Sequence, residues 1–305
     1  MGLPFHVLFC WIFVDLFGLQ LAGIGIAKSM TFGILVALQF LYIKIFNPCP
    51  QAKLKFRLIN FRFFKKYLKD TFVQGSSYYF EWISFEVLTM MVGLFGDTVA
   101  LAGHSIATNL IVMIANLILG TIIPVTILLG NSVGEGNIKL AKKYMKIGGL
   151  IIVTMLTLVT SLVFYFRDQI GYLYIDDPQI VNACSEILFI YTFALIPDYI
   201  VNTVGSYLRT LGHENFVMNS FLVCYYGFGL PLSALLGFVL HMSFEGIWGG
   251  LVFGVYAMTI LVILKFSKLD IRYEITKIWK ELTTGDAMTE MSTFLDAQMV
   301  QSSHL

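Results

Sequence analysis

The stretch VALAGHSIATNLIVMIANLILGTIIPVTILL (Val99–Leu129) contains no Asp, Glu, Lys or Arg. About 20 apolar residues in a helix are enough to cross the hydrocarbon core of a bilayer, so this stretch predicts a membrane-spanning helix. The whole chain has the same character: 57% of its 305 residues are hydrophobic and 13% are charged. A soluble domain carries about 25% charged residues. We therefore expect an all-α integral membrane protein without a soluble domain of useful size.

Eight stretches along the chain have the length and apolar composition of a membrane span. They are Leu3–Leu19, Ala22–Ile45, Phe72–Phe95, Val99–Leu129, Tyr144–Phe166, Asn182–Leu208, Phe216–Leu240 and Gly246–Phe266. Only two residues separate the first two stretches, which predicts a tight helical hairpin. After the last stretch the chain is polar. Ile271, Ile275, Ile278, Trp279 and Leu282 follow helical spacing. We therefore expect this part to lie on the membrane surface and the end from Thr283 to be disordered.

Lysine and arginine gather in alternate connections between the predicted spans. These residues are Lys53, Lys55, Arg57, Arg62, Lys65, Lys66 and Lys69 before the third span, Lys139, Lys142, Lys143 and Lys146 after the fourth, Arg209 after the sixth, and Lys265, Lys268, Arg272, Lys277 and Lys280 after the eighth. The other connections carry at most one positive charge. Basic loops favour the cytoplasmic side, so we expect these connections, and both ends of the sequence, to face the cytoplasm.

Several classes of protein have no support in the sequence. A net charge of +1 gives no basic character suited to nucleic acid. Cys10, Cys49, Cys184 and Cys224 lack the spacing of a zinc site or a disulfide framework. The HExxH, GxSxG and P-loop motifs are missing, and the five histidines are isolated and expected at span ends or in loops. We expect neither an enzyme nor a protein with a cofactor, a metal or a nucleic-acid partner.

Three acidic residues lie deep inside predicted spans, Glu81 and Glu86 in the third and Asp198 in the sixth, whereas Asp15 lies near the end of the first span. An ionisable group within a membrane is costly and is often functional. Asp198 follows Pro197, which removes a backbone hydrogen bond and frees a carbonyl group. Such breaks are tolerated in membranes where protein or water satisfies the freed group. Bent helices around buried acids favour a transporter over an inert bundle.

The two glutamates of the third span cannot share one face of a helix, because five residues correspond to roughly 140° of rotation. Glu81 shares its face with Tyr78 and Phe85, at positions i−3 and i+4. An aromatic face that carries one acid is suited to a lipophilic cation. The alternative is aromatic packing between helices, with Glu81 as a buried hydrogen-bond partner.

Four segments, in order, resemble motifs of the MATE (multidrug and toxic compound extrusion) transporters. They are FEWISFEVLTMMVGLFGDTVALAGHSIATNL (Phe80–Leu110), GNSVGEGNIKLAKK (Gly130–Lys143), YLRTLGHEN (Tyr207–Asn215) and YYGFGLPLSALLGFVLHMSFEGIWGG (Tyr225–Gly250). The first contains an E-W-x-x-F/Y-E signature formed by Glu81, Trp82, Phe85 and Glu86. The resemblance extends from Leu3 to about Leu282.

This resemblance implies a domain organisation. The eight spans correspond to helices five to twelve of a two-lobed transporter of twelve helices, so the sequence is expected to be a partial chain that lacks the first four. Residues 1–46 are then the last two helices of the first lobe, and 47–68 a basic cytoplasmic linker. Residues 69–266 are the six-helix second lobe, and 267–305 a cytoplasmic tail that is first amphipathic and then disordered.

The resemblance to eukaryotic members also implies a function. It is the export of organic cations or other xenobiotics in exchange for protons, from a multi-pass protein of the plasma membrane or an internal acidic compartment. Glu81 and Asp198 match the proton-coupling acids, and Glu86 matches a further family acid. Asn109 stands where some animal members carry another acid. Tyr78, Trp82, Phe85 and Asn109 are the candidate substrate-binding residues. No cofactor is implied beyond the coupling proton.

Two alternatives stay open from the sequence. A partial chain is not expected to transport alone, so it is either part of a complete antiporter or a degenerate, non-transporting fragment that associates with a full-length relative. A lipid flippase of the same superfamily would carry the same helices with a different cavity lining.

The distribution of positive charge leads to a test of topology. In a variant without its native cysteines, Asp176→Cys should react with a membrane-impermeant maleimide added to intact cells, because Asp176 lies in a connection that is poor in lysine and arginine. Lys142→Cys should react only after the cells are permeabilised. Labelling of Lys142→Cys in intact cells would reverse the predicted orientation.

Overall fold

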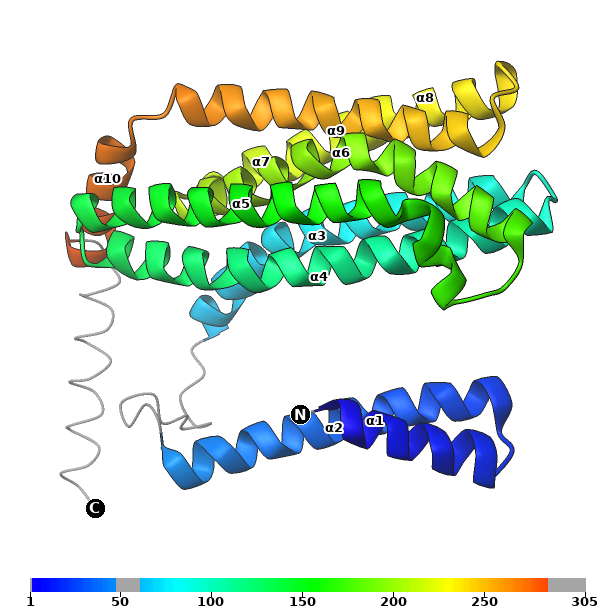
Figure 1. The fold of residues 1–305 in the computed structure, drawn as a ribbon. Helices are drawn as coiled ribbons and strands as arrows, with labels where there is room; N and C mark the ends of the chain where they lie inside the picture. The colour runs from blue at the N-terminus through cyan, green and yellow to red at the C-terminus, as the bar shows by residue number, and fades with distance from the viewer. Residues whose placement is uncertain (1, 48–60, 285–305) are drawn as a thin grey trace. The chain divides into compact units, whose positions relative to one another are not determined.

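The computed structural model describes residues 2–47 and 61–284, and every regular element within these ranges is helical. The elements are α1 (Gly2–Cys10), η1 (Trp11–Leu16), α2 (Gln20–Phe46), α3 (Phe61–Gly93), α4 (Thr98–Gly134), α5 (Ile138–Ile170), η4 (Gly171–Leu173), α6 (Pro178–Thr210), α7 (Glu214–Phe221), η5 (Leu222–Gly229), α8 (Leu230–Ala234), η6 (Leu235–Val239), α9 (Ser243–Ser267) and α10 (Ile271–Thr284). Figure 1 shows their arrangement. All eight predicted spans are helical, which confirms the all-α membrane fold.

Six of the described spans are long and apolar enough to cross a membrane: α2, α4, α5 with η4, α6, the run from α7 to η6, and α9. The segment Gly2–Leu16 is apolar but shorter. Helix α3 is long enough but more polar, because Glu81, Glu86 and several serines interrupt it. It also begins at Phe61, eleven residues before the predicted start at Phe72.

The chain divides into two compact units, Met1–Phe64 and Lys65–Leu305. In the first unit, α1 and η1 pack against α2 as the predicted hairpin. Gly18 adopts a positive φ of 64° in the turn, a conformation that glycine takes without steric cost. Across the hairpin, the side chains of His6 and Thr31 share a hydrogen bond of 3.2 Å.

The second unit is a helical bundle built around α6, which contacts α4, α5, α7 and α9. Along most of its length α6 is buried, and it supplies many residues of the main hydrophobic core. Gly103 allows α4 to approach α6 closely. A Cβ at this position would lie 2.7 Å from the Cβ of Ala183 and 3.0 Å from the backbone nitrogen of Cys184, both on α6. The core therefore surrounds the helix that carries Asp198.

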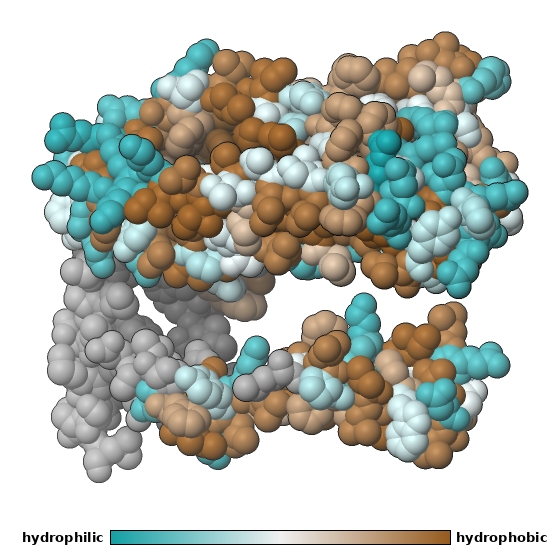
Figure 2. Space-filling view, viewed as in Figure 1, coloured by the Kyte–Doolittle hydropathy of each residue, from teal (hydrophilic) through white to brown (hydrophobic). Residues whose placement is uncertain are grey.

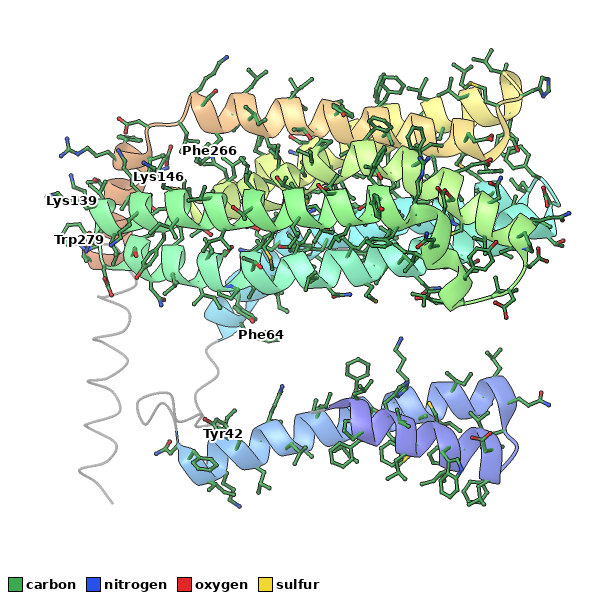
Figure 3. All side chains as sticks on the ribbon, in the orientation of Figure 1. Tyr42, Phe64, Lys139, Lys146, Phe266 and Trp279 are labelled. Carbon is green, nitrogen blue, oxygen red and sulfur yellow. The ribbon has the colours of Figure 1, made fainter. Side chains whose placement is uncertain are left out.

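Hydrophilic side chains occupy both ends of this bundle and hydrophobic ones cover its sides, as Figure 2 shows. The connection between α4 and α5, the one between α6 and α7, and α10 meet at one end. There, Trp279 lies against Gly136, and a His213 nitrogen is 3.4 Å from a Glu274 carboxylate oxygen. Figure 3 labels Lys139, Lys146, Phe266 and Trp279 at this end. The basic connections described in this unit thus gather at one end, as the sequence predicts.

Helix α10 forms where the sequence predicts helical spacing, and its apolar side meets the bundle. Ile275 is fully buried in a small core with Leu129, Val133, Ala141 and Met145 of α4 and α5. The apolar side of α10 therefore packs on the ends of α4 and α5. The tail after Thr284, the linker residues 48–60 and Cys49 lie outside the described residues.

The contact between α8 and α9 can be tested with two adjacent glycines of α9. A Cβ on Gly250 would lie 2.2 Å from the backbone nitrogen of Ser233, whereas Gly249 meets only the end of Leu236, at 4.0 Å. Gly250→Ala should destabilise the solubilised chain by about 1–3 kcal/mol, the usual cost of overpacking. Gly249→Ala should leave the thermal midpoint unchanged or raise it slightly. Equal midpoints for the two variants would contradict this helix packing.

Candidate ion-coupling site

The helix break at Pro197 is satisfied by α9. Proline removes the donor that would serve the carbonyl of residue i−4, here Phe193. The hydroxyl of Tyr256 donates to this Phe193 carbonyl at 3.0 Å. The hydroxyl of Thr259 lies between two carbonyl oxygens, that of Val255 on its own helix at 2.8 Å and that of Pro197 at 3.1 Å. Side chains of a neighbouring helix thus replace water at the break, as a membrane requires.

Directly after this break, the carboxyl group of Asp198 is buried, with 6% of the residue exposed. The hydroxyl of Tyr191, two turns earlier on α6, donates to its Oδ2 at 3.2 Å. Its Oδ1 has no hydrogen-bond partner among the described residues, and the same holds for the hydroxyls of Tyr199 and Tyr225. Oδ2 of Asp198 therefore has a hydrogen-bond donor, whereas Oδ1 of the same carboxyl group, which lies near Tyr199 and Tyr225, has none among the described residues.

Asn202 connects the two acids that the sequence analysis paired. It lies one turn after Asp198, and its amide nitrogen is 3.1 Å from the backbone carbonyl of Asp198. The same nitrogen is 3.4 Å from a carboxylate oxygen of Glu81 on α3. Glu81 and Asp198 also interact electrostatically, so a proton on one acid affects the charge that the other can carry. The structure therefore brings Glu81 and Asp198 into one site.

The aromatic face of α3 is partly occupied by a cation of the protein itself. The guanidinium of Arg209 lies 4.6 Å from the centre of the Tyr78 ring and donates to the Tyr78 hydroxyl at 3.0 Å. Arg209 also interacts electrostatically with Glu81. A cationic ligand at Tyr78 would have to compete with this arginine.

Phe85 belongs to a separate aromatic contact. Its ring centre lies 6.3 Å from that of Trp248 on α9, and the same indole lies 6.1 Å from the ring of Tyr191. Phe85 is therefore near the acid site through Trp248, and it takes part in aromatic packing between helices.

Three predicted site residues are not brought to Glu81 and Asp198. Glu86 and Trp82 are exposed on α3, and neither has a hydrogen bond in the described part of the chain. Asn109 is exposed on α4, and its amide donates to the Ser105 carbonyl of its own helix at 2.9 Å. The exposure of Glu86 and the partial burial of Glu81 agree with the separate faces predicted from their spacing.

The MatE family model matches residues 76–235, which is more than half of the chain and contains all the site residues predicted from the sequence. This chain belongs to the MATE transporter family. Membership places it among transporters and not among enzymes. It also makes the chain a multi-pass membrane protein, in agreement with the spans described above.

Individual relatives have low sequence identity to this chain. The probable multidrug resistance protein NorM of Geobacillus kaustophilus is 27% identical over 293 residues, which cover 94% of this chain and 62% of that protein. Protein DETOXIFICATION 20 of Arabidopsis thaliana is 24% identical over 273 residues, which cover 88% of this chain and 55% of that protein. This MATE chain therefore spans about three fifths of the length of such relatives.

Solved structures of MATE transporters have the same fold. The crystal structure of the eukaryotic MATE transporter AtDTX14 superposes with a TM-score of 0.84 at 22% identity, over 92% of this chain and 63% of that one. The bent form of VcmN from Vibrio cholerae gives 0.69 at 16% identity, over 91% and 62%. At these identities the likeness concerns the fold alone.

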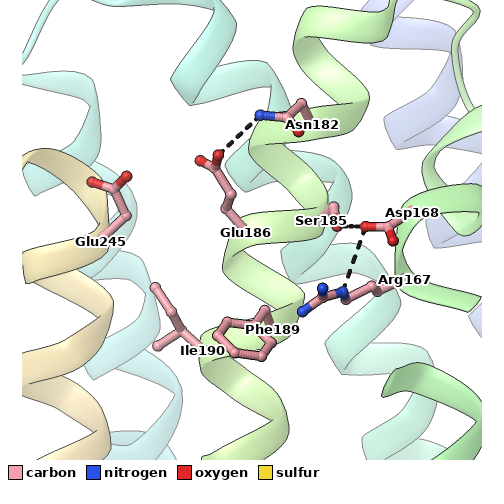
Figure 4. Close-up of a pocket in the computed structure, with 8 residues that line it drawn as sticks. All are labelled: Arg167, Asp168, Asn182, Ser185, Glu186, Phe189, Ile190 and Glu245. Atoms are coloured by element: carbon pink, nitrogen blue, oxygen red, sulfur yellow. Dashed lines mark hydrogen bonds and ion pairs between the residues drawn. The ribbon is translucent and has the colours of Figure 1, made fainter. Parts of the chain in front are cut away.

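A further pocket of this MATE chain lies at the end of the bundle opposite Lys139. It has a volume of about 410 Å³ and is lined by Arg167, Asp168, Asn182, Ser185, Glu186, Phe189, Ile190 and Glu245 (Figure 4). The guanidinium of Arg167 lies 4.4 Å from the centre of the Phe189 ring and 3.5 Å from Asp168. The charges that line the pocket are therefore partly paired with one another.

Sequence reasoning missed Asn202, Tyr191, Arg209 and Trp248. The first three share α6 with Asp198, and Asn202 and Tyr191 lie four and seven residues from it, the spacing of one helix face. Asn202 and Tyr191 could have been found by searching for polar residues at helical spacing from the intramembrane acid. Trp248 carries no such signal, because its position depends on how α9 packs.

The role of Tyr256 at the helix break can be measured. Tyr256→Phe should lower the free energy of unfolding by about 1–3 kcal/mol, because the freed carbonyl of Phe193 loses its donor. Tyr165→Phe is the matched control, since this exposed tyrosine of α5 has no hydrogen bond through its hydroxyl among the described residues. A thermal midpoint of Tyr256→Phe equal to that of the control would show that the break needs no donor from α9.

Proposed function

We propose that this chain forms part of a two-lobed secondary antiporter, which exports organic cations or related xenobiotics in exchange for protons. In this proposal residues 1–46 supply the last two helices of the first lobe and residues 69–266 the second lobe. The names of the bacterial relatives, which are called probable multidrug resistance proteins, support the substrate class. The proposed locations are the plasma membrane or an internal acidic compartment, where a proton gradient exists.

The observation that carries the proposal is the pairing of Glu81 and Asp198 through Asn202. Two carboxyl groups that interact away from water resist being charged together. Such a pair can hold one proton and release it when a positive charge arrives. No lysine or arginine lies within α6 before Arg209 at its end, so a proton or a transported cation is the natural counter-charge for Asp198.

The exchange then follows from competition for one negative charge. When the pair holds a proton, a cationic substrate lacks its electrostatic partner and leaves. When the proton departs, the pair carries additional negative charge and attracts the next cation. The site is exposed to each side of the membrane in turn as one lobe rocks against the other. This alternation couples the movement of the cation to the movement of the proton. No covalent step is required.

Arg209 adds a condition to this scheme. Its guanidinium already provides a positive charge near Glu81 and covers Tyr78. A substrate cation that binds at Tyr78 must therefore displace Arg209, whereas no lysine or arginine of the described residues takes this place at Asp198. We infer that Asp198 is the acid that responds most directly to the transported proton.

This proposal is tested by conservative changes to the acids in the two-lobed transporter. Glu81→Gln and Asp198→Asn keep the side-chain shape but cannot bind and release a proton, so cation flux should no longer respond to an imposed pH gradient. The double variant should be little worse than either single one, because groups that act as a unit are not additive. The measurement is gradient-driven flux in proteoliposomes at matched protein content.

Glu86→Gln serves as the control within the same helix, because Glu86 is exposed and outside the buried pair. It should retain most of the gradient-driven flux. If Glu86→Gln abolishes the response while Glu81→Gln retains it, the coupling face of α3 is wrong. If all three variants respond fully to the gradient, the proton site lies outside the second lobe.

A further inference from the structure

His104 lies in the second turn of α4, near a span end as expected, but it is not isolated. Only 1% of the residue is exposed. Its Nε2 is 2.8 Å from the hydroxyl of Thr89 on α3, and the indole N–H of Trp248 on α9 donates to its Nδ1 at 3.2 Å. A single buried side chain thus connects three helices of the second unit.

These contacts define which nitrogen of His104 carries the proton. An indole N–H can only donate, so Nδ1 must be an unprotonated acceptor. A neutral imidazole then carries its proton on Nε2, which can donate to the oxygen of Thr89. The Thr89 hydroxyl is free to accept, because its own proton is directed to the carbonyl of Phe85 at 3.0 Å. The network is complete only with neutral His104 in this one tautomer.

The groups that hydrogen-bond to His104 are all uncharged. Thr89 comes from α3, Trp248 from α9, and Thr108 from its own helix at 3.4 Å. On the side of α6, the packing of Gly103 brings Ala183 and the backbone of Cys184 close. None of these groups would compensate a positive charge. A protonated His104 would also direct an Nδ1–H at the indole N–H and break that hydrogen bond.

Trp248 transmits the position of His104 to the acid site. Its side chain is fully buried, and its ring contacts Phe85 of α3 and the edge of Tyr191 of α6. Tyr191 in turn donates to Oδ2 of Asp198. A rotation of the indole would change the packing of the tyrosine that holds this carboxyl group.

We propose that His104 is a positioning residue for Asp198: as a neutral acceptor it fixes the indole of Trp248, which in turn keeps Tyr191 on the carboxyl group. The inference rests on the proposed function of Asp198 in proton coupling. It assigns no transported proton to His104, because the network excludes the charged imidazole. What His104 controls is the pH at which Asp198 exchanges its proton.

Two substitutions test the roles of the two His104 nitrogens one at a time. His104→Asn places an amide oxygen near the position of Nδ1, where it can still accept from Trp248. His104→Gln reaches toward the position of Nε2, so it keeps the contact with Thr89 and removes the acceptor for the indole. A role in positioning predicts that Asn substitutes for histidine and that Gln does not. A role in packing alone predicts no such order.

The first measurement uses the 305-residue chain in detergent, labelled with 5-fluorotryptophan and observed by fluorine NMR. The sequence has four tryptophans, and the resonance of Trp248 is identified by its loss in Trp248→Phe. We expect this resonance to stay near its original position in His104→Asn and to shift or broaden in His104→Gln. This result does not depend on transport.

The second measurement is the pH profile of cation flux in the two-lobed transporter. Tyr191, Tyr199, Tyr225 and Glu81 are the titratable groups around Asp198. Loss of the Tyr191 donor disfavours the charged carboxylate, so Tyr191→Phe should move the half-maximal flux to higher pH by about one unit. His104→Gln and Trp248→Phe should shift the profile in the same direction, and their combination no further than either alone. His104→Asn should keep the original profile.

Several results would overturn the inference. One is a pH-dependent flux with the same profile in His104→Gln and His104→Asn. Another is the loss of pH dependence in both variants, which would make His104 a proton carrier or a packing residue. If the unmodified transporter shows no pH-dependent flux, the proposed function fails, and with it the role of His104 toward Asp198. The fluorine spectrum would then still show whether the hydrogen bond to Trp248 exists.

Discussion

In a membrane, polar backbone and side-chain groups must find their partners within the protein, and α6 is the helix on which this constraint acts most strongly. It carries a proline and a carboxylic acid side by side, each of which would be costly in lipid. Tyr256 of the neighbouring helix α9 donates to the backbone carbonyl freed by the proline. Tyr191 and Asn202, which lie on α6 itself, form hydrogen bonds with the side chain and the backbone of Asp198. The close packing of α4 and α9 on α6 keeps these partners in place.

The site is asymmetric in its charge. On one side, toward the end that bears the basic connections, Arg209 lies over Tyr78 and acts on Glu81. On the other side, toward the pocket lined by Glu186 and Glu245, the contacts of Asp198 continue into the neutral network of Tyr191, Trp248 and His104. Arg209 thus places a positive charge near one acid, whereas the groups that continue from the other acid are uncharged. In the proposed antiporter, two acids in such different environments can divide the tasks of binding a cation and exchanging a proton.

The sequence alone was sufficient to predict the helical architecture. Long apolar runs predict spans wherever they occur, because lipid accepts only backbone that satisfies its own hydrogen bonds. The periodicity of α3 also separated Glu81 from Glu86, and the proline before Asp198 indicated a freed carbonyl. The start of α3 was missed by eleven residues, since helix formation continues into the polar segment before the span. The partner of α10 was also missed, because apolar spacing on a helix does not distinguish lipid from protein.

What the sequence by itself determined is therefore the all-helical membrane fold, the family and the acids that stand within long helices. Only the tertiary structure decided which residues these acids meet. Asn202 joins Glu81 to Asp198 across 121 residues of sequence, and Trp248 meets His104 across 144. Such pairs depend on how helices rotate and cross, which is decided by close packing at positions such as Gly103. Local residue patterns describe one helix at a time and contain no measure of that rotation.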